Sequence, residues 1–269
     1  MFLFCLKATT LKETLFEFPF NHEINNADMA FEAISEKLSS LVNPILFLPN
    51  LQEISFEFDD TKGYYRKDII IFSTLDNTKT ELISLTQTVE ERTEERKLWL
   101  FSRVDKESGR YAVGFYLNED GNFTPVDEYA YCFFPTKTNT GLHFIIHAPF
   151  LLTDSREGIK QGDRHNKRMI DLLSSLAADS LVYLRDIGFQ EKHCLINDHI
   201  LDIVPTESFD QTNWWGTIVQ KSEFEPFYER ILEAFQTKQI IPTKTSFTTA
   251  LNAYWSETGD ISNVFNKKS

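Results

Sequence analysis

The sequence predicts an α+β fold with a β-rich first half, a long helix after it and a small α/β tail. Phenylalanine is unusually abundant, with 24 copies among 269 residues, and many of them lie in the β-type runs that are typical of half-buried strands. Turn residues divide the chain up to about residue 147 into short segments, which favours an antiparallel sheet. Beyond Asp163 the apolar residues repeat at helical spacing instead.

The predicted sheet consists of short β-type segments joined by tight turns. Asp76 and Asn77 form one turn signal, and residues 119–121 form another. The charged run 90–97 is interpreted as a solvated helical turn or a hairpin tip. Residues 14–20, which end in a proline-containing run, are interpreted as an edge or terminal strand. The main strands are expected at 54–58, 68–73, 82–89, 98–104, 111–117, 129–134 and 142–147. Their spacing predicts an antiparallel meander.

Three helices are predicted from apolar spacing. The first is capped by Asp28, places Phe31 and Ile34 toward the core, and ends before Pro44. The longest follows Asp163 and ends at a cap on Gly188. Its apolar face is formed by Met169, Leu172, Leu173, Leu176, Leu181 and Leu184. The third spans about 222–236, and residues 240–242 after it form a short buried strand.

Composition limits the compartment and the partners. The three cysteines lie far apart and show no metal-binding spacing, so we expect neither a disulfide framework nor a cysteine zinc site. No segment approaches the roughly 18 apolar residues of a membrane span. The cysteine pattern fits a reducing compartment, and we expect a cytoplasmic protein. A net charge of −13 repels phosphate backbones and anionic lipids, so we expect it to bind neither nucleic acid nor membrane.

The most informative segment is 131–161, which reads YCFFPTKTNTGLHFIIHAPFLLTDSREGIKQ. It predicts a strand, a polar loop, a second strand and a second polar loop ahead of the long helix. Lys137 lies in the first loop and Arg156 in the second. Loops on a rigid scaffold are where functional side chains concentrate, so these two cations are the candidate site residues. The alternative for Arg156 is a surface ion pair with Asp154 or Glu157, and for Lys137 an ordinary exposed lysine.

This segment resembles the middle, or transducer, region of GHKL-type ATPases of the heat-shock-chaperone and sacsin-like kind, in which a Ser-Arg-Glu loop precedes a long helix. The resemblance implies a transducer-like α/β sandwich covered by that helix. It also implies that Arg156 contacts the γ-phosphate of ATP held by another domain. Lys137, within Pro-Thr-Lys, resembles the transducer-loop lysine of the gyrase-type and mismatch-repair members. The two residues are therefore candidates for both catalysis and cofactor contact.

The resemblance extends over most of the chain at lower specificity and suggests a division into three parts. Residues 1–20 resemble the terminal strand of a nucleotide-binding domain, residues 21–190 the middle domain, and residues 191–269 a smaller C-terminal extension. The Asp-x-Gly-x-Gly loop and the glycine-rich lid of a GHKL pocket do not occur in this sequence. ATP and Mg²⁺ are therefore expected only through an absent or partner nucleotide-binding domain.

We predict that the chain is a fragment of an ATPase, namely its middle segment. It would couple the hydrolysis of ATP held by another domain to conformational change. It acts in cis or in trans with a nucleotide-binding domain and does not turn over ATP alone. Protein clients and a homodimer are left open. The alternative is a non-catalytic, protein-binding scaffold of the same fold. His143 and His147, four residues apart, lack a third metal ligand and are interpreted as structural.

Overall fold

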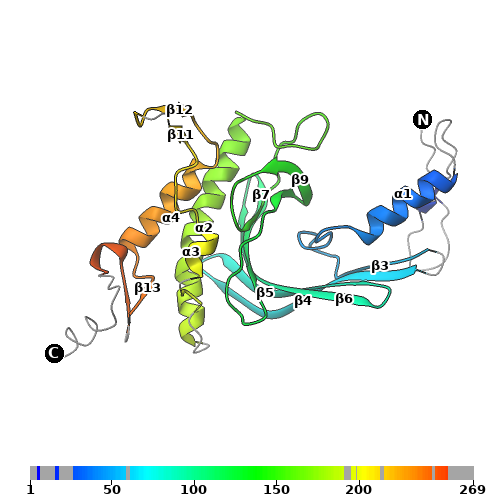
Figure 1. Ribbon diagram of the computed structural model, residues 1–269, viewed down its shortest axis with the longest axis horizontal. Coiled ribbons are helices and arrows are strands. Elements are labelled where there is room, and N and C mark those ends of the chain that lie inside the picture. Colours follow the sequence, from blue (N-terminus) through cyan, green and yellow to red (C-terminus); the bar gives the residue numbers. More distant parts are fainter. Residues whose placement is uncertain are drawn as a thin grey trace.

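The computed structural model of the chain describes residues 5–6, 16–17, 27–58, 61–190, 195–197, 199–212, 215–243 and 246–253. An eight-stranded sheet with helices beside it dominates these residues (Figure 1), which confirms the predicted α+β class. Most of the predicted strand at 14–20 lies outside the described residues. The part that is described, β2 (Phe16–Glu17), pairs with β1 (Cys5–Leu6).

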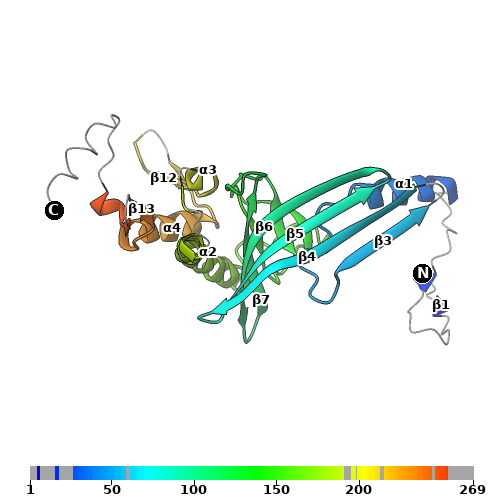
Figure 2. The same cartoon turned by 90° about the horizontal axis from the view of Figure 1, so that it is seen from below.

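The sheet begins as the predicted antiparallel meander. The strand order is β3-β4-β5-β6-β7-β10-β8-β9, and only β10 and β8 pair in parallel among the strands described. The strands are β3 (Glu53–Phe58), β4 (Thr61–Leu75), β5 (Thr78–Val89), β6 (Arg92–Asp105), β7 (Gly109–Leu117), β8 (Tyr129–Cys132), β9 (Phe134–Asn139) and β10 (Ile145–His147). Strands β4, β5 and β6 are longer than predicted and form one extended ribbon (Figure 2).

Both faces of the sheet carry a core because side chains alternate along each strand. On β6, Trp99 and Phe101 belong to the core under the long helix, whereas Leu98 and Leu100 belong to the core on the opposite face. All four are buried. Such two-sided burial explains why this strand reads as a continuous apolar run rather than as an alternation.

The first face is covered by α2 (Arg164–Gln190), and α4 (Glu225–Thr237) packs side by side with α2 (Figure 1). Asp163 caps α2 by accepting the amide hydrogens of His165 and Asn166. Arg103 on β6 bonds to Thr78 and Tyr183 and lies 2.8 Å from Asp179, so a charged tie fixes α2 to the sheet.

The opposite face is covered by residues 43–48, which follow α1 (Ala27–Ser39). Lys67 Nζ donates to three carbonyls of this segment, at 3.0 Å to Ile45, 3.4 Å to Leu46 and 2.7 Å to Leu48. Asn43, held at a left-handed φ of 45°, donates to the hydroxyls of Tyr116 and Tyr131. A short irregular segment is thereby fixed on the sheet by polar contacts at both ends.

Several helix details differ from the sequence prediction. Phe31 and Ile34 on α1 are 38% and 44% exposed rather than buried, so the apolar stripe is only partly covered. Gly188 does not end the long helix, which continues to Gln190, because packing against the sheet outweighs the weak helix propensity of one glycine. The run from Arg92 to Lys97 is an exposed extension of β6, and only residues 90–91 form the hairpin turn.

The rest of the described chain forms small elements around α4. They are α3 (Ile200–Ile203), β11 (Gln211–Thr212), β12 (Ile218–Gln220), β13 (Ile241–Pro242), β14 (Phe247–Thr248) and the short helix η1 (Ala250–Asn252). Ile196, Ile203 and Phe227 share one core with the sheet residues, so side chains from both sides of residue 190 pack together. Within the described ranges, no helix has the length and apolar character needed to span a bilayer.

Candidate functional site

The candidate site is a closed loop, residues 151–160, that connects β10 to the turn before α2. Its two arms are bonded to each other: the Lys160 amide donates to the Leu151 carbonyl at 2.9 Å and the Thr153 amide donates to the Gly158 carbonyl at 2.8 Å. At its tip, the Arg156 amide donates to the Thr153 carbonyl at 2.8 Å. These bonds give the tip a defined conformation, and we call residues 151–160 the contact loop.

Asn166, in the first turn of α2, holds the base of the contact loop. Its side chain is 1% exposed, accepts the Leu151 amide at 2.8 Å, and donates to the carbonyls of Leu151 and Lys160 at 2.8 and 2.9 Å. A buried amide with three good partners is strongly position-determining, since the loss of any partner leaves a desolvated group unpaired. Asn166 was not among the predicted site residues, and the only signal for it in the sequence is a polar residue in the first turn of the amphipathic helix.

The side of the contact loop lies against β9. Lys137 donates its amide to the Glu157 carbonyl, and its Nζ lies 2.6 Å from Glu157 Oε1. The Ile159 amide donates to Thr138 Oγ1 at 2.8 Å. The prediction that Lys137 lies in a polar loop is therefore wrong, because Lys137 lies within the edge strand β9. The pairing with β8 that makes them a strand depends on contacts outside their own polar sequence.

Arg156 is presented at the loop tip. It is exposed, and within the described part of the chain its side chain has no hydrogen bond or ion pair. The predicted alternative partner, Glu157, is taken by Lys137 instead. The backbone of Arg156 has a φ of 59°, the left-handed region that costs a non-glycine residue about 1 kcal/mol or more. A loop bonded on all sides therefore holds an arginine where glycine or asparagine would be less strained.

The structure brings the segments of the two predicted site residues together. Lys137 and Arg156 are 19 positions apart in sequence, yet the bonds between β9 and residue 157 join their segments. The ion pair between Lys137 and Glu157 is exposed on both sides and worth less than about 1 kcal/mol, so an incoming anion can displace the carboxylate at small cost. His143 and His147 differ in their surroundings: the first is exposed and the second is buried against Phe47.

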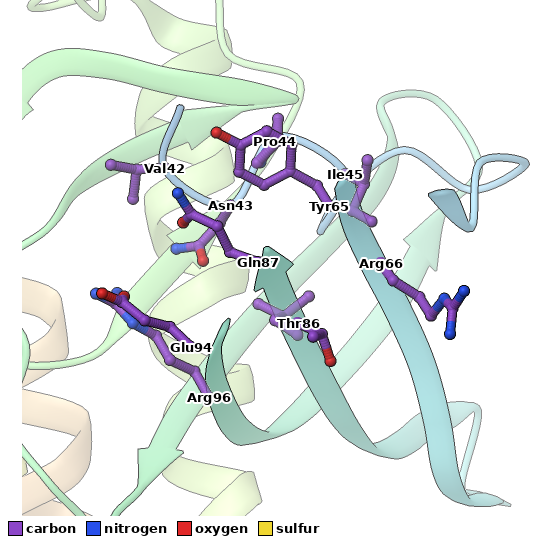
Figure 3. A pocket seen from close by; sticks show the side chains of 11 residues that line it. Val42, Asn43, Pro44, Ile45, Tyr65, Arg66, Thr86, Gln87, Glu94 and Arg96 are labelled. Atoms are coloured by element: carbon purple, nitrogen blue, oxygen red, sulfur yellow. The ribbon is translucent and has the colours of Figure 1, made fainter. Parts of the chain in front are cut away.

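A second place with converging polar groups is a cavity between residues 42–45 and strands β4 to β6 (Figure 3). Asn43, Gln87, Glu94 and Arg96 are the polar residues labelled on one side of the cavity in Figure 3. The cavity measures about 50 Å³, which admits a few water molecules.

The groups behind this cavity have a structural role. Tyr131 donates to Glu128 at 2.7 Å, and Asn43 also contacts that carboxylate at 3.3 Å. Burial, and then the nearby Glu128, raise the pKa of Tyr116 and Tyr131 far above the ordinary tyrosine value, so both stay protonated. They act as neutral hydrogen-bonding groups that fix Asn43 and offer no general base.

Among the residues that the structure describes, no group of three or more His, Cys, Asp or Glu side chains is placed to hold a metal ion. Comparisons of the chain with protein-family models, with curated proteins and with solved structures found no match. The contact loop is therefore interpreted from its own chemistry: a hydrogen-bonded loop presents an exposed guanidinium that has no partner in the described chain, beside a strand whose Lys137 ammonium is paired with Glu157. Guanidinium and ammonium groups are the side chains that bind oxyanions.

Proposed function

We propose that the chain is the middle, transducer-like segment of a GHKL-type ATPase, and that Arg156 contacts the terminal phosphate of ATP held by a separate nucleotide-binding domain. One observation carries the proposal: Arg156 is exposed and unpaired, in the described chain, on a loop that is bonded at its base, side and tip. The constrained backbone fixes where the side chain leaves the surface, and a guanidinium without a partner in the described chain is available to a ligand that comes from outside.

The residues of the site fit a phosphate. A planar guanidinium can donate two parallel hydrogen bonds to phosphate oxygens, and the ammonium group of Lys137 adds a second positive charge once Glu157 is displaced. ATP with Mg²⁺ supplies the phosphoryl chemistry, and this chain stabilises negative charge at the phosphate. Phosphoryl transfer depends mainly on positioning and charge, and in GTPases an arginine of this kind accelerates it about 10³- to 10⁵-fold.

The proposal defines the partners of the chain. Its principal partner is a nucleotide-binding domain, encoded ahead of residue 1 or on a second chain, that docks on the surface formed by β9 and the contact loop. We place the protein in the cytoplasm, where ATP is available, and expect no nucleic-acid ligand because the net charge is −13. The client, if the ATPase acts as a chaperone, follows from the domains attached to it and not from this site.

The test is ATP turnover in the complex. The nucleotide domain for this test is sought in the coding region ahead of residue 1 and among co-occurring GHKL proteins. It is recognised by an acid-and-Asn helix and an Asp-x-Gly-x-Gly loop. Arg156→Ala is expected to lower turnover at least 100-fold, with the melting temperature of the chain changed little because the side chain has no partner here.

The matched control is Arg164→Ala, which removes an exposed arginine at the start of α2 and is expected to leave turnover within twofold. Equal turnover for Arg156→Ala and the wild type would reject the phosphate contact and favour the scaffold alternative. Lys137→Ala is expected to have a smaller effect than Arg156→Ala, because Lys137 must first leave Glu157.

A further inference from the structure

Strand β4 has an open edge along its second half. Its first residues, from Thr61 to Arg66, pair with β3, whereas β5 accompanies it to Leu75. The amide of Lys67 makes the last bond toward β3, to Gln52. From Asp68 onward no described strand lies on that side, and Figure 2 shows this end of β4 running beyond the end of β3. We call residues 68–75 the open edge.

The open edge carries a run of exposed apolar side chains. Ile69, Ile70, Ile71, Phe72 and Leu75 are between 37% and 59% exposed. Single exposed apolar residues are ordinary, but a contiguous run on an unpaired strand is an aggregation hazard unless something covers it. A bulge between Ile69 and Ile71 interrupts the ladder to β5, but the apolar side chains remain in contact with solvent.

The backbone of the open edge can accept another strand. The turn between β4 and β5 has two residues, Asp76 and Asn77, both with positive φ, which is the geometry of a type I′ turn. Such a turn closes on a hydrogen-bonded pair, here Leu75 and Thr78, and bonded and non-bonded pairs then alternate along the ladder. The amide and carbonyl groups of Phe72 and Thr74 therefore point away from β5, toward the open side.

Positive charge lies beside the open edge. Lys79 Nζ is 5.2 Å from the centre of the Phe72 ring and 2.7 Å from Glu81, and Arg110 reaches the same carboxylate at 3.3 Å. Lys67, whose Nζ is bonded to the carbonyls of residues 45, 46 and 48, adds a further positive charge on this face of the sheet, and burial followed by repulsion from Arg110 lowers its pKa to about 8. Two cations, Lys79 and Arg110, thus share the buried carboxylate of Glu81 in a chain whose net charge is −13. An occupant with a carboxylate would balance this excess.

A second copy of the chain fits this edge poorly. Antiparallel pairing of two open edges would bring the Asp68 end of each copy toward the Asp76 turn of the other, because these two aspartates flank the segment at its two ends. Both aspartates are exposed at the ends of the segment. Like charges brought close together disfavour the pairing, and two copies would also bring together two strongly acidic chains.

We propose that the open edge of β4 binds an extended segment of another protein, which adds a strand to the sheet and carries alternating apolar residues with an acidic residue that meets Lys79. Main-chain hydrogen bonds at Phe72 and Thr74 provide the pairing, the exposed isoleucines and Phe72 provide the apolar contact, and Lys79 selects for the acid. The proposal is independent of the phosphate contact.

The experiment selects ten-residue peptides from a phage-displayed random library on the immobilised full chain. Enriched peptides are expected to alternate apolar residues and to contain Asp or Glu. The strongest is then labelled and its affinity measured by fluorescence anisotropy. Thr74→Pro removes an outward amide without touching the ladder to β5 and is expected to weaken binding at least tenfold. Thr74→Val keeps the amide and is the matched control, expected within twofold of the wild type.

A second variant keeps the test independent of folding at residue 74. Lys79→Gln is expected to weaken the acidic peptide at least threefold and to leave unchanged the affinity for a peptide in which glutamine replaces the acid. A selection without enrichment, or peptide binding that neither variant weakens, would overturn the proposal. So would a dimer of the wild type in sedimentation that Thr74→Pro dissociates, since the occupant would then be a second copy.

Discussion

His147 makes the stability of the sheet sensitive to acid. It ends β10, is 1% exposed, stacks on Phe47 with ring centres 4.3 Å apart, and accepts the Phe133 amide on Nδ1 at 3.3 Å. Burial, and then the charge of Arg110, lower its pKa from 6.5 to about 3. Protonation would place a charge in this core and would turn the Nδ1 acceptor into a donor facing another donor.

The size of the effect follows from proton linkage. The folded pKa lies below the unfolded value, so between pH 3 and 6.5 the unfolded chain binds more protons than the folded chain, and stability falls as the pH is lowered through this window. Each pH unit is worth about 1.4 kcal/mol, which gives about 2 to 3 kcal/mol between pH 6.5 and 4.5. That is a large share of the roughly 5 to 15 kcal/mol that stabilises a typical domain.

Urea unfolding at pH 7, 5.5 and 4.5 tests this reasoning with His147→Gln, which keeps an acceptor for the Phe133 amide and does not titrate. The wild type is expected to lose about 2 to 3 kcal/mol relative to this variant between pH 6.5 and 4.5, although both also lose stability from their carboxylates. His143→Gln, at an exposed position, is the control and should follow the wild type. A difference between wild type and His147→Gln that stays constant with pH would refute the assignment.

Two further substitutions test the packing that supports the sheet and the contact loop. A Cβ at Gly63 would lie 2.3 Å from the Phe56 ring and 2.7 Å from the Thr88 carbonyl, so Gly63→Ala is expected to lower the free energy of unfolding in urea by about 1 to 3 kcal/mol. Gly158→Ala is the control: a Cβ there has no neighbour closer than 3.5 Å, and the change should stay within about 0.5 kcal/mol. Asn166→Ala removes three hydrogen bonds at the base of the contact loop; we expect a loss of about 2 to 4 kcal/mol and faster hydrogen exchange at the Leu151 amide. If the Leu151 amide exchanges at the same rate in Asn166→Ala as in the wild type, Asn166 does not hold the loop.

The strands and the long helix were predictable because their signals are local. Apolar runs bounded by turn residues gave the meander, and Asp163 followed by residues at helical spacing gave the start of α2. The strand ends were less predictable, because β4 and β6 extend through charged residues whose side chains stay in solvent. The length of these strands is set by main-chain hydrogen bonding, which does not depend on side-chain polarity.

The candidate site was predictable as two cations but not as an arrangement. Nothing near Lys137 in sequence indicates that Glu157, twenty positions later, becomes its partner, or that Thr138 accepts a bond from the contact loop. The polar residues around Lys137 form a strand because β8 lies beside them. Contacts between distant segments set each of these features, and such contacts leave no periodic trace in the sequence.

The contact loop and the open edge of β4 lie at opposite sides of one sheet, since β9 ends the strand order and β4 lies next to its other end. They share no residue, and continuous strand pairing from β4 through β7, β10 and β8 to β9 joins them. Coupling between two sites requires an element that has two arrangements and that both sites bias. A continuously paired sheet has a single arrangement and does not meet this requirement. We therefore expect Arg156→Ala to leave peptide affinity at the open edge within twofold, and Thr74→Pro to leave ATP turnover of the complex within twofold, with the double variant showing the product of the single effects. A change of more than fivefold in either cross-measurement would show that the sheet itself changes arrangement, and would make the open edge a regulatory surface for the ATPase.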